Sequence, residues 1–192
     1  GSHIAVQGVY HEGIVIDNNI IRDMDEVAIK LYNYKDTTIS NNKISGGVEA
    51  ILVYTALEGD TGEHCLKPLE GNPAEEPESH NIVITGNEIE KTASLEDVYG
   101  DAIRISASKE VPITGVKISE NIIKNVSRYG IFITQVAKAE ITNNEISSSG
   151  NHAILLEKNS TDSVIKTNTI TKPGKSGIAL YSASNKATVS GN

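Results

Sequence analysis

"AEITNNEISSSG", residues 139–150, contains a short phrase that returns along the whole chain: an aliphatic residue, two variable residues, an asparagine, one variable residue and a second aliphatic residue. Successive asparagines of this phrase are 23, 45, 34, 23, 24 and 24 residues apart. A unit of about 23 residues therefore explains four intervals directly, and the other two as one unit plus an insertion. The asparagines are Asn19, Asn42, Asn87, Asn121, Asn144, Asn168 and Asn192.

A second apolar element lies between these phrases and consists of a small residue, isoleucine, a variable residue and an aliphatic residue. Such alternation is typical of a short strand with one buried face. The isoleucine two residues after each repeated asparagine supplies a further strand, so each repeat carries three strand-like pieces. The element reads AIKL at 28–31, AILV at 50–53, AIRI at 102–105, GIFI at 130–133, AILL at 153–156 and GIAL at 177–180.

Three inward-pointing strands in each unit of about 23 residues predict an all-β parallel β-helix solenoid of about seven coils, with coils about 4.8 Å apart. The repeated asparagine fits a sharp bend, because asparagine tolerates left-handed backbone angles and its amide can bond to the same residue in the next coil. A leucine-rich repeat is the main alternative. Isoleucine outnumbers leucine by 26 to 9, however, and β-branched residues favour strands on every limb.

Composition limits the function classes. The formal net charge of −8 opposes binding to nucleic acid, and no apolar run approaches the roughly 20 residues of a membrane-inserted helix. The single cysteine, Cys65, excludes an intramolecular disulfide. Residues 1–3 have the sequence of a tag remnant, and residues 4–192 are predicted to form one β-helix module of a longer chain. Because neither end shows a cap, we expect missing capping segments or self-association to cover the terminal coils.

The asparagine phrases resemble a known family. Asn42-Lys43-Ile44, Asn121-Ile122-Ile123 and Asn144-Glu145-Ile146, each followed by a Gly/Ala-Ile strand, resemble the right-handed β-helix repeats of the pectate-lyase-like superfamily. This resemblance implies a right-handed coil and an extracellular or cell-surface protein that acts on an acidic polysaccharide as a lyase or epimerase. The same superfamily contains tailspikes and non-catalytic binders, so a glycan-binding, adhesive or structural module is the alternative.

Two insertions interrupt the repeat, at 55–80 and at 93–100, and both adjoin one predicted sheet. That sheet contains Ile29, Ile51, Ile103 and Ile131. Function in repeat proteins concentrates where insertions break the period. We therefore expect a groove over the outer face of this sheet, where the families resembled bind their polysaccharide.

Alternation places a set of polar residues on this sheet. Glu49 and Asp101 are expected on adjacent coils about 5 Å apart, where they would share a Ca²⁺ ion or raise the pKa of one carboxyl group for proton transfer. Two solvated acids are the alternative. Arg104 is a candidate to neutralise a sugar carboxylate during β-elimination, or else it forms an ion pair with Asp101.

The remaining candidates lie at other outward positions of the same predicted sheet. Tyr129 and His152 are predicted catalytic residues, since tyrosine and histidine beside a basic residue serve as acid and base in the polyuronate lyases and epimerases that the chain resembles. A surface histidine at a turn is the alternative for His152. The segment YGDAIRI at 99–105 partly resembles an alginate-epimerase motif but lacks its histidine. Amphipathic rings suit the face of a sugar, and the alternative is that the tyrosines shield strand edges and the walls of the loop. The alternative for Lys30 is a solvated position on the face. The predicted substrate-binding residues are Lys30, Tyr32, Tyr54 and Tyr99.

Overall fold

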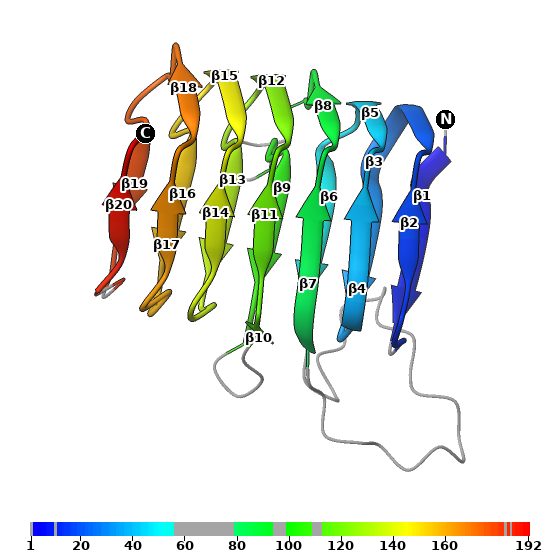
Figure 1. The fold of residues 1–192 in the computed structure, drawn as a ribbon. Helices are drawn as coiled ribbons and strands as arrows, with labels where there is room; N and C mark the ends of the chain where they lie inside the picture. Colours follow the sequence, from blue (N-terminus) through cyan, green and yellow to red (C-terminus); the bar gives the residue numbers. More distant parts are fainter. Residues whose placement is uncertain are drawn as a thin grey trace.

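The computed structural model describes residues 2–9, 11–55, 79–93, 99–108, 113–182, 184 and 186–192. Regular structure in these ranges is entirely β-strand, and every strand pair is parallel. Strands of successive coils lie side by side from the N-terminal end to the C-terminal end of the solenoid (Figure 1). Within the same ranges, no helix is long and apolar enough to cross a membrane.

The coil has three faces. The first face joins seven strands in coil order, and β10 (Ile113–Thr114) also pairs with β7. The seven are β2 (Val15–Asp17), β4 (Lys35–Ser40), β7 (Ser79–Thr85), β11 (Lys117–Ser119), β14 (Glu140–Thr142), β17 (Val164–Lys166) and β20 (Thr188–Ser190).

The second and third faces share the long strand β3 (Ile20–Tyr32), which runs along one and then the other. The second face continues from β3 through β5 (Lys43–Gly46), β8 (Glu88–Glu90), β12 (Ile122–Val126), β15 (Glu145–Ser149) and β18 (Thr169–Thr171). The third face contains β1 (Ser2–Val9), the end of β3, β6 (Glu49–Tyr54), β9 (Ile103–Ser106), β13 (Ile131–Thr134), β16 (Ile154–Glu157) and β19 (Ile178–Leu180).

Aligned aliphatic residues fill the bore. On the third face, Ile29 pairs with Ile51, Ile51 with Ile103, and the column continues to Ile178. Equivalent columns run down the other faces from Ile16 and Ile21. Because these side chains form one continuous buried cluster, the two apolar elements of the repeat are the core of the fold.

The repeated asparagines form the predicted ladder at the bend between the first and second faces. Each side-chain amide donates to the side-chain oxygen of the asparagine in the next coil, at 2.8–3.0 Å, from Asn19 through to Asn192. The backbone N–H of each asparagine donates to the same oxygen. Buried amides in every coil are thus satisfied by one another, as buried polar groups must be.

The backbone geometry of this bend corrects one part of the prediction. The left-handed residue is the one before each ladder asparagine, with φ of 54° at Asn41, 58° at Glu120 and 55° at Thr167. The ladder residues themselves do not have positive φ. Asparagine is therefore selected at the ladder position for its amide, and the preceding position carries the backbone strain.

Candidate functional site

On the outer side of the third face, residues of neighbouring strands pair in register. Leu52 pairs with Arg104, Arg104 with Phe132, and Phe132 with Leu155. Since the isoleucines at the intervening positions enter the bore, these side chains lie on the opposite side of the sheet. The predicted outward position of Arg104 is confirmed, and on the same side Phe132 and Leu155 form a buried cluster separate from the bore.

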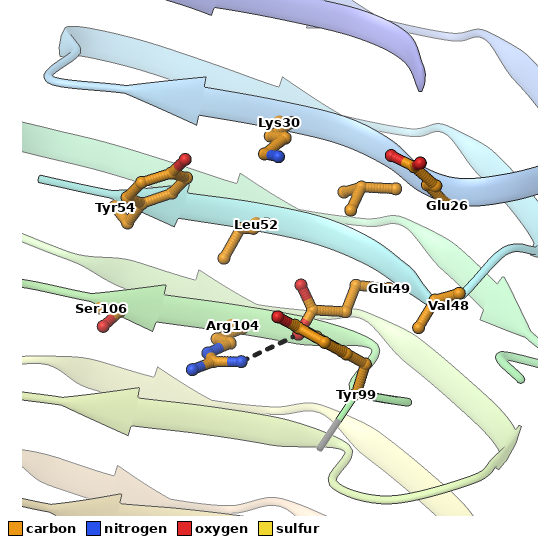
Figure 2. Close-up of a pocket in the computed structure, with 10 residues that line it drawn as sticks. Glu26, Lys30, Val48, Glu49, Leu52, Tyr54, Tyr99, Arg104 and Ser106 are labelled. Carbon is orange, nitrogen blue, oxygen red and sulfur yellow. Dashed lines mark hydrogen bonds and ion pairs between the residues drawn. The ribbon is translucent and has the colours of Figure 1, made fainter. Parts of the chain in front are cut away.

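A hollow of about 410 Å³ lies over β3, β6 and β9 on this face (Figure 2). It contains five of the predicted site residues, and its walls combine two cations with two tyrosines and an apolar leucine. Tyr99 is 40% exposed, so its ring is accessible. The described lining residues are Glu26, Val27, Lys30, Val48, Glu49, Leu52, Tyr54, Tyr99, Arg104 and Ser106.

Glu49 and Arg104 form an ion pair beneath this hollow. Arg104 Nη1 donates to Glu49 Oε1 at 3.2 Å, and the glutamate side chain is 0% exposed whereas that of the arginine is 23% exposed. Burial raises the pKa of Glu49 above its ordinary value, and the nearby Arg104 only partly opposes this shift. The alternative that Glu49 is a solvated acid is therefore wrong. Glu49 positions Arg104, and Arg104 is the group that a ligand can reach.

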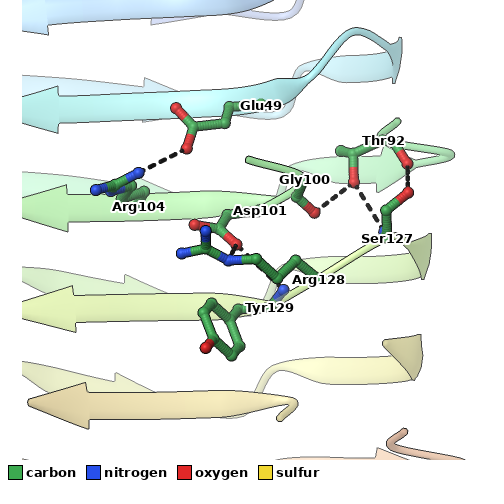
Figure 3. Close-up of polar contacts among 8 residues, drawn as sticks. All are labelled: Glu49, Thr92, Gly100, Asp101, Arg104, Ser127, Arg128 and Tyr129. Atoms are coloured by element: carbon green, nitrogen blue, oxygen red, sulfur yellow. Dashed lines mark hydrogen bonds and ion pairs between the residues drawn. The ribbon is translucent and has the colours of Figure 1, made fainter. Parts of the chain in front are cut away.

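Asp101 pairs with an arginine that the sequence did not single out. Its Oδ1 lies 3.0 Å from Arg128 Nε and accepts a hydrogen bond from the backbone N–H of Tyr129 at 3.2 Å (Figure 3). The expected pair between Arg104 and Asp101 is wrong, because Arg104 reaches across to Glu49 on the preceding strand instead. Burial raises the pKa of Asp101 to about 7, against the opposing charge of Arg128.

The bend that carries Arg128 is fixed by its own hydrogen bonds (Figure 3). The Arg128 N–H donates to Gly100 O at 3.0 Å, and Thr92 Oγ1 donates to the same carbonyl at 2.8 Å. A Cβ on Gly100 would lie 3.1 Å from Ser127 Cβ and 3.3 Å from Arg128 Cβ, and φ there is +128°. The only available sequence signal was a glycine and an arginine at equivalent bend positions, each three residues before a core isoleucine.

Tyr129 and His152 lie farther along the same face and are not among the described residues that line the hollow. Their rings are parallel with centroids 5.9 Å apart, and His152 Nε2 lies 3.1 Å from the Tyr181 hydroxyl. His152 is buried, which lowers its pKa with help from Lys175. The expectation of a surface histidine at a turn is therefore wrong: His152 is a packed residue that accepts a hydrogen bond from Ser176 N–H at Nδ1.

Tyr32 also differs from its predicted role. Its side chain is 1% exposed, and its ring centroid lies 3.8 Å from that of Tyr54. A ring packed in this way has no free face for a sugar, which corrects its assignment as a substrate-binding residue. Tyr54, Tyr99 and Lys30 remain at the hollow.

The predicted groove walls are the two insertions, at 55–80 and at 93–100. Most of the 55–80 and 93–100 insertions lies outside the described residues, and so do residues 109–112. Thr55 at the start of the first insertion and Ser79 at its end are both buried. The first insertion therefore follows β6 of the third face and precedes β7 of the first, whereas the second follows β8 of the second face and precedes β9 of the third.

A calcium site does not fit the described residues. Ca²⁺ needs six to eight oxygen ligands, but Glu49 and Asp101 are both 0% exposed and each faces a guanidinium group. In the described ranges no group of three or more histidine, cysteine, aspartate or glutamate residues is placed to hold a metal. The two carboxylates are instead neutralised by arginine.

Comparison with known proteins gives the fold family. The family described as "Right handed beta helix region" matches residues 1–115 and 75–192, which together span the chain. The chain therefore belongs to the right-handed β-helix family, and the predicted right-handed parallel β-helix is confirmed. No curated protein and no solved structure matches the chain.

Proposed function

We propose that the protein is an extracellular or cell-surface β-helix that binds an acidic polysaccharide, with one charged sugar unit in the hollow over β3, β6 and β9. The observation that carries this proposal is Arg104, a guanidinium held on the floor of the hollow by a buried carboxylate. Arginine matches a planar carboxylate or a sulfate with paired N–H donors. Lys30 and Arg104 place two cations at this hollow in a protein of net charge −8, and Arg104 is the exposed partner of its ion pair with Glu49, which favours an anionic ligand there.

The walls of the hollow suit the rest of a sugar. Tyr54 and Tyr99 offer amphipathic rings to the apolar face of a pyranose, and Leu52 adds an apolar surface between them. Lys30 supplies a second cation at the rim. Convergent polar groups around a small apolar surface are the usual composition of a ligand pocket.

Binding is tested on a panel of pectate, alginate, hyaluronan and chondroitin by isothermal titration calorimetry. We expect the native protein to bind at least one polyanion, and Arg104→Gln to weaken that binding about tenfold or more, since a charge-assisted hydrogen bond contributes about 1.5–3 kcal/mol. Lys124→Gln, on the second face, removes the same charge away from the hollow and is the matched control. Equal affinities for the two variants would exclude Arg104 as the anion-binding group.

A lyase or epimerase is a second candidate, and one observation favours it. Asp101 has a pKa of about 7, so a buried acid that can exchange a proton near neutral pH lies close to the Glu49–Arg104 pair, and burial raises the pKa of Glu49 as well. Elimination from a polyuronate produces an unsaturated sugar that absorbs near 235 nm, and epimerisation exchanges the C5 proton with solvent. Absorbance and deuterium exchange on each bound polymer, with and without Ca²⁺, test turnover. Binding with neither signal would identify a non-catalytic glycan-binding, adhesive or tailspike-like module.

A further inference from the structure

Arg128 lies on the same outer face as Arg104 but outside the hollow. Its guanidinium carbon is 4.5 Å from the centroid of the Tyr129 ring and 5.5 Å from that of Phe132. The side chain is 15% exposed, so it is held against the sheet while part of it stays accessible. Guanidinium groups over aromatic faces are stabilised by cation–π attraction.

Arg104 flanks the same aromatic ring. Its guanidinium carbon is 5.3 Å from the Phe132 centroid, and Phe132 is the direct neighbour of Arg104 in the parallel sheet. Both guanidinium carbons lie within 5.5 Å of the Phe132 centroid, so they can be no farther apart than the sum of these two distances. Two like charges are thus held close together on one surface.

Each arginine is fixed by a buried acid. Glu49 accepts from Arg104 Nη1, and Asp101 lies against Arg128 Nε. A guanidinium has five N–H donors, and one carboxylate contact leaves most of them available. Side chains fixed in advance lose less conformational entropy when a ligand binds. The arrangement is therefore pre-organised to receive more than one anionic group.

We propose that Arg128 forms a second anion subsite next to Arg104, so that the pair binds two neighbouring carboxylate or sulfate groups of one acidic glycan. This inference rests on the proposed function and extends it from one charged sugar to two. The ligand class is a saccharide with negative groups on nearby residues. Phe132 is buried and lies against both guanidinium groups, so it holds them on one surface.

The test compares fragments that carry one carboxylate with fragments that carry two, prepared from pectate, alginate and hyaluronan. Titration calorimetry at constant ionic strength measures their affinity for native protein, Arg104→Gln, Arg128→Gln and Lys124→Gln. We expect Arg128→Gln to weaken binding of the doubly charged fragment about tenfold while the singly charged fragment keeps its native affinity. Lys124→Gln should leave both affinities unchanged.

A structural effect of the substitution is separated by a second variant. Arg128→Gln leaves Asp101 buried without a charge partner, which destabilises proteins; Asp101→Asn/Arg128→Gln removes both charges and should reproduce the selective loss with a native unfolding midpoint. Equal affinities of native and variant protein for the doubly charged fragment, or equal weakening of both fragments, would overturn the second subsite. Failure of the native protein to bind any fragment is a different result, because it would overturn the proposed function itself.

Discussion

The asparagine bend and the outer side of the third face are both polar, yet they are built in opposite ways. At the bend, one residue type recurs in every coil and each amide is paired with its own kind. On the third face, the column that contains Arg104 changes from leucine to arginine to phenylalanine within three coils, and the arginine pairs with a glutamate from a different strand.

This contrast separates structure from site in a repeat protein. Every ladder amide satisfies its neighbours, so the ladder has no spare donor for a ligand except at its ends. The ionic residues of the third face are paired only in part: the buried atoms Glu49 Oε2, Asp101 Oδ2 and Arg104 Nε have no hydrogen-bond partner among the described residues, and the side chains of Arg104 and Arg128 are partly exposed. The regular polar column holds the fold, and the irregular one carries the candidate site.

The largest expected effect comes from breaking the ladder in its middle. Asn121→Ala removes an amide that contacts Asn87, Asn144 and the carbonyl of Ile84, and leaves several buried groups without partners. With about 1–3 kcal/mol for each unsatisfied group, we expect the free energy of unfolding to fall by about 4 kcal/mol or more. Urea denaturation measures it. Asn19→Ala, at the exposed end of the ladder, should cost about 1 kcal/mol, and equal losses at the two positions would contradict the ladder's cooperative role.

Two adjacent isoleucines of β12 sharpen the distinction between bore and surface. Ile123 is 0% exposed and Ile122 is 37% exposed. Ile123→Ala should reduce the free energy of unfolding by about 3 kcal/mol, as expected for a large-to-small change in a packed core. Ile122→Ala should change it by less than about 1 kcal/mol. Similar losses in denaturation experiments would show that the two side chains are not on opposite sides of the strand.

The ionic face should make stability depend on pH. The pKa of Asp101 is about 7 in the folded protein and 3.8 in its ordinary state, so between these values the folded state binds more protons than the unfolded state. The free energy of unfolding must then fall as pH rises from about 4 to about 7, by at most about 1.4 kcal/mol per pH unit. Asp101→Asn should remove this contribution in denaturation curves.

The variant isolates Asp101 from other titrating groups. The raised pKa of Glu49 acts in the same direction, and the lowered pKa of His152 acts in the opposite one. Both groups are present in native protein and in Asp101→Asn, so the difference between the two pH profiles reports Asp101 together with its electrostatic interaction with Glu49. Parallel profiles would mean that Asp101 titrates normally.

The smallest effect on stability is expected at the rim of the hollow. Tyr99 is 40% exposed, so Tyr99→Ala should change the free energy of unfolding by less than about 0.5 kcal/mol while it weakens glycan binding several-fold. Tyr32→Ala, at a buried ring, should instead cost about 3 kcal/mol. Thermal unfolding and calorimetry on both variants check this contrast, and a stability loss at Tyr99 would show that the ring serves the fold.

The sequence predicted the features that repetition encodes. Spacing of Asn121 and Asn144 and the alternation around Ile103 and Ile131 were sufficient to predict the ladder, the three strands per coil and the outward columns, because stacked coils place equivalent residues in contact. The position of the hollow followed from the insertions. These are properties of the backbone period, which a single sequence displays directly.

The pairing of long side chains could not be predicted in this way. Alternation assigns a residue to a side of the sheet, but an arginine spans more than one coil spacing, so Arg104 reaches Glu49 and Arg128 reaches Asp101. Burial of Tyr32 and His152 depends on neighbours from other coils rather than on local pattern. Polar residues on the outer face were therefore located correctly while their exposure and partners were not.

The ladder also explains why the coils tolerate interruptions of such different length. Asn42 and Asn87 are bonded amide to amide although 45 residues separate them, and Asn121 and Asn144 do the same across 23. Each asparagine pair brings the chain back to the same position in the coil, whatever the length of the segment between the two asparagines. Evolution can therefore lengthen a single turn, or duplicate and delete whole turns, and graft new recognition loops without redesigning the tube beneath them.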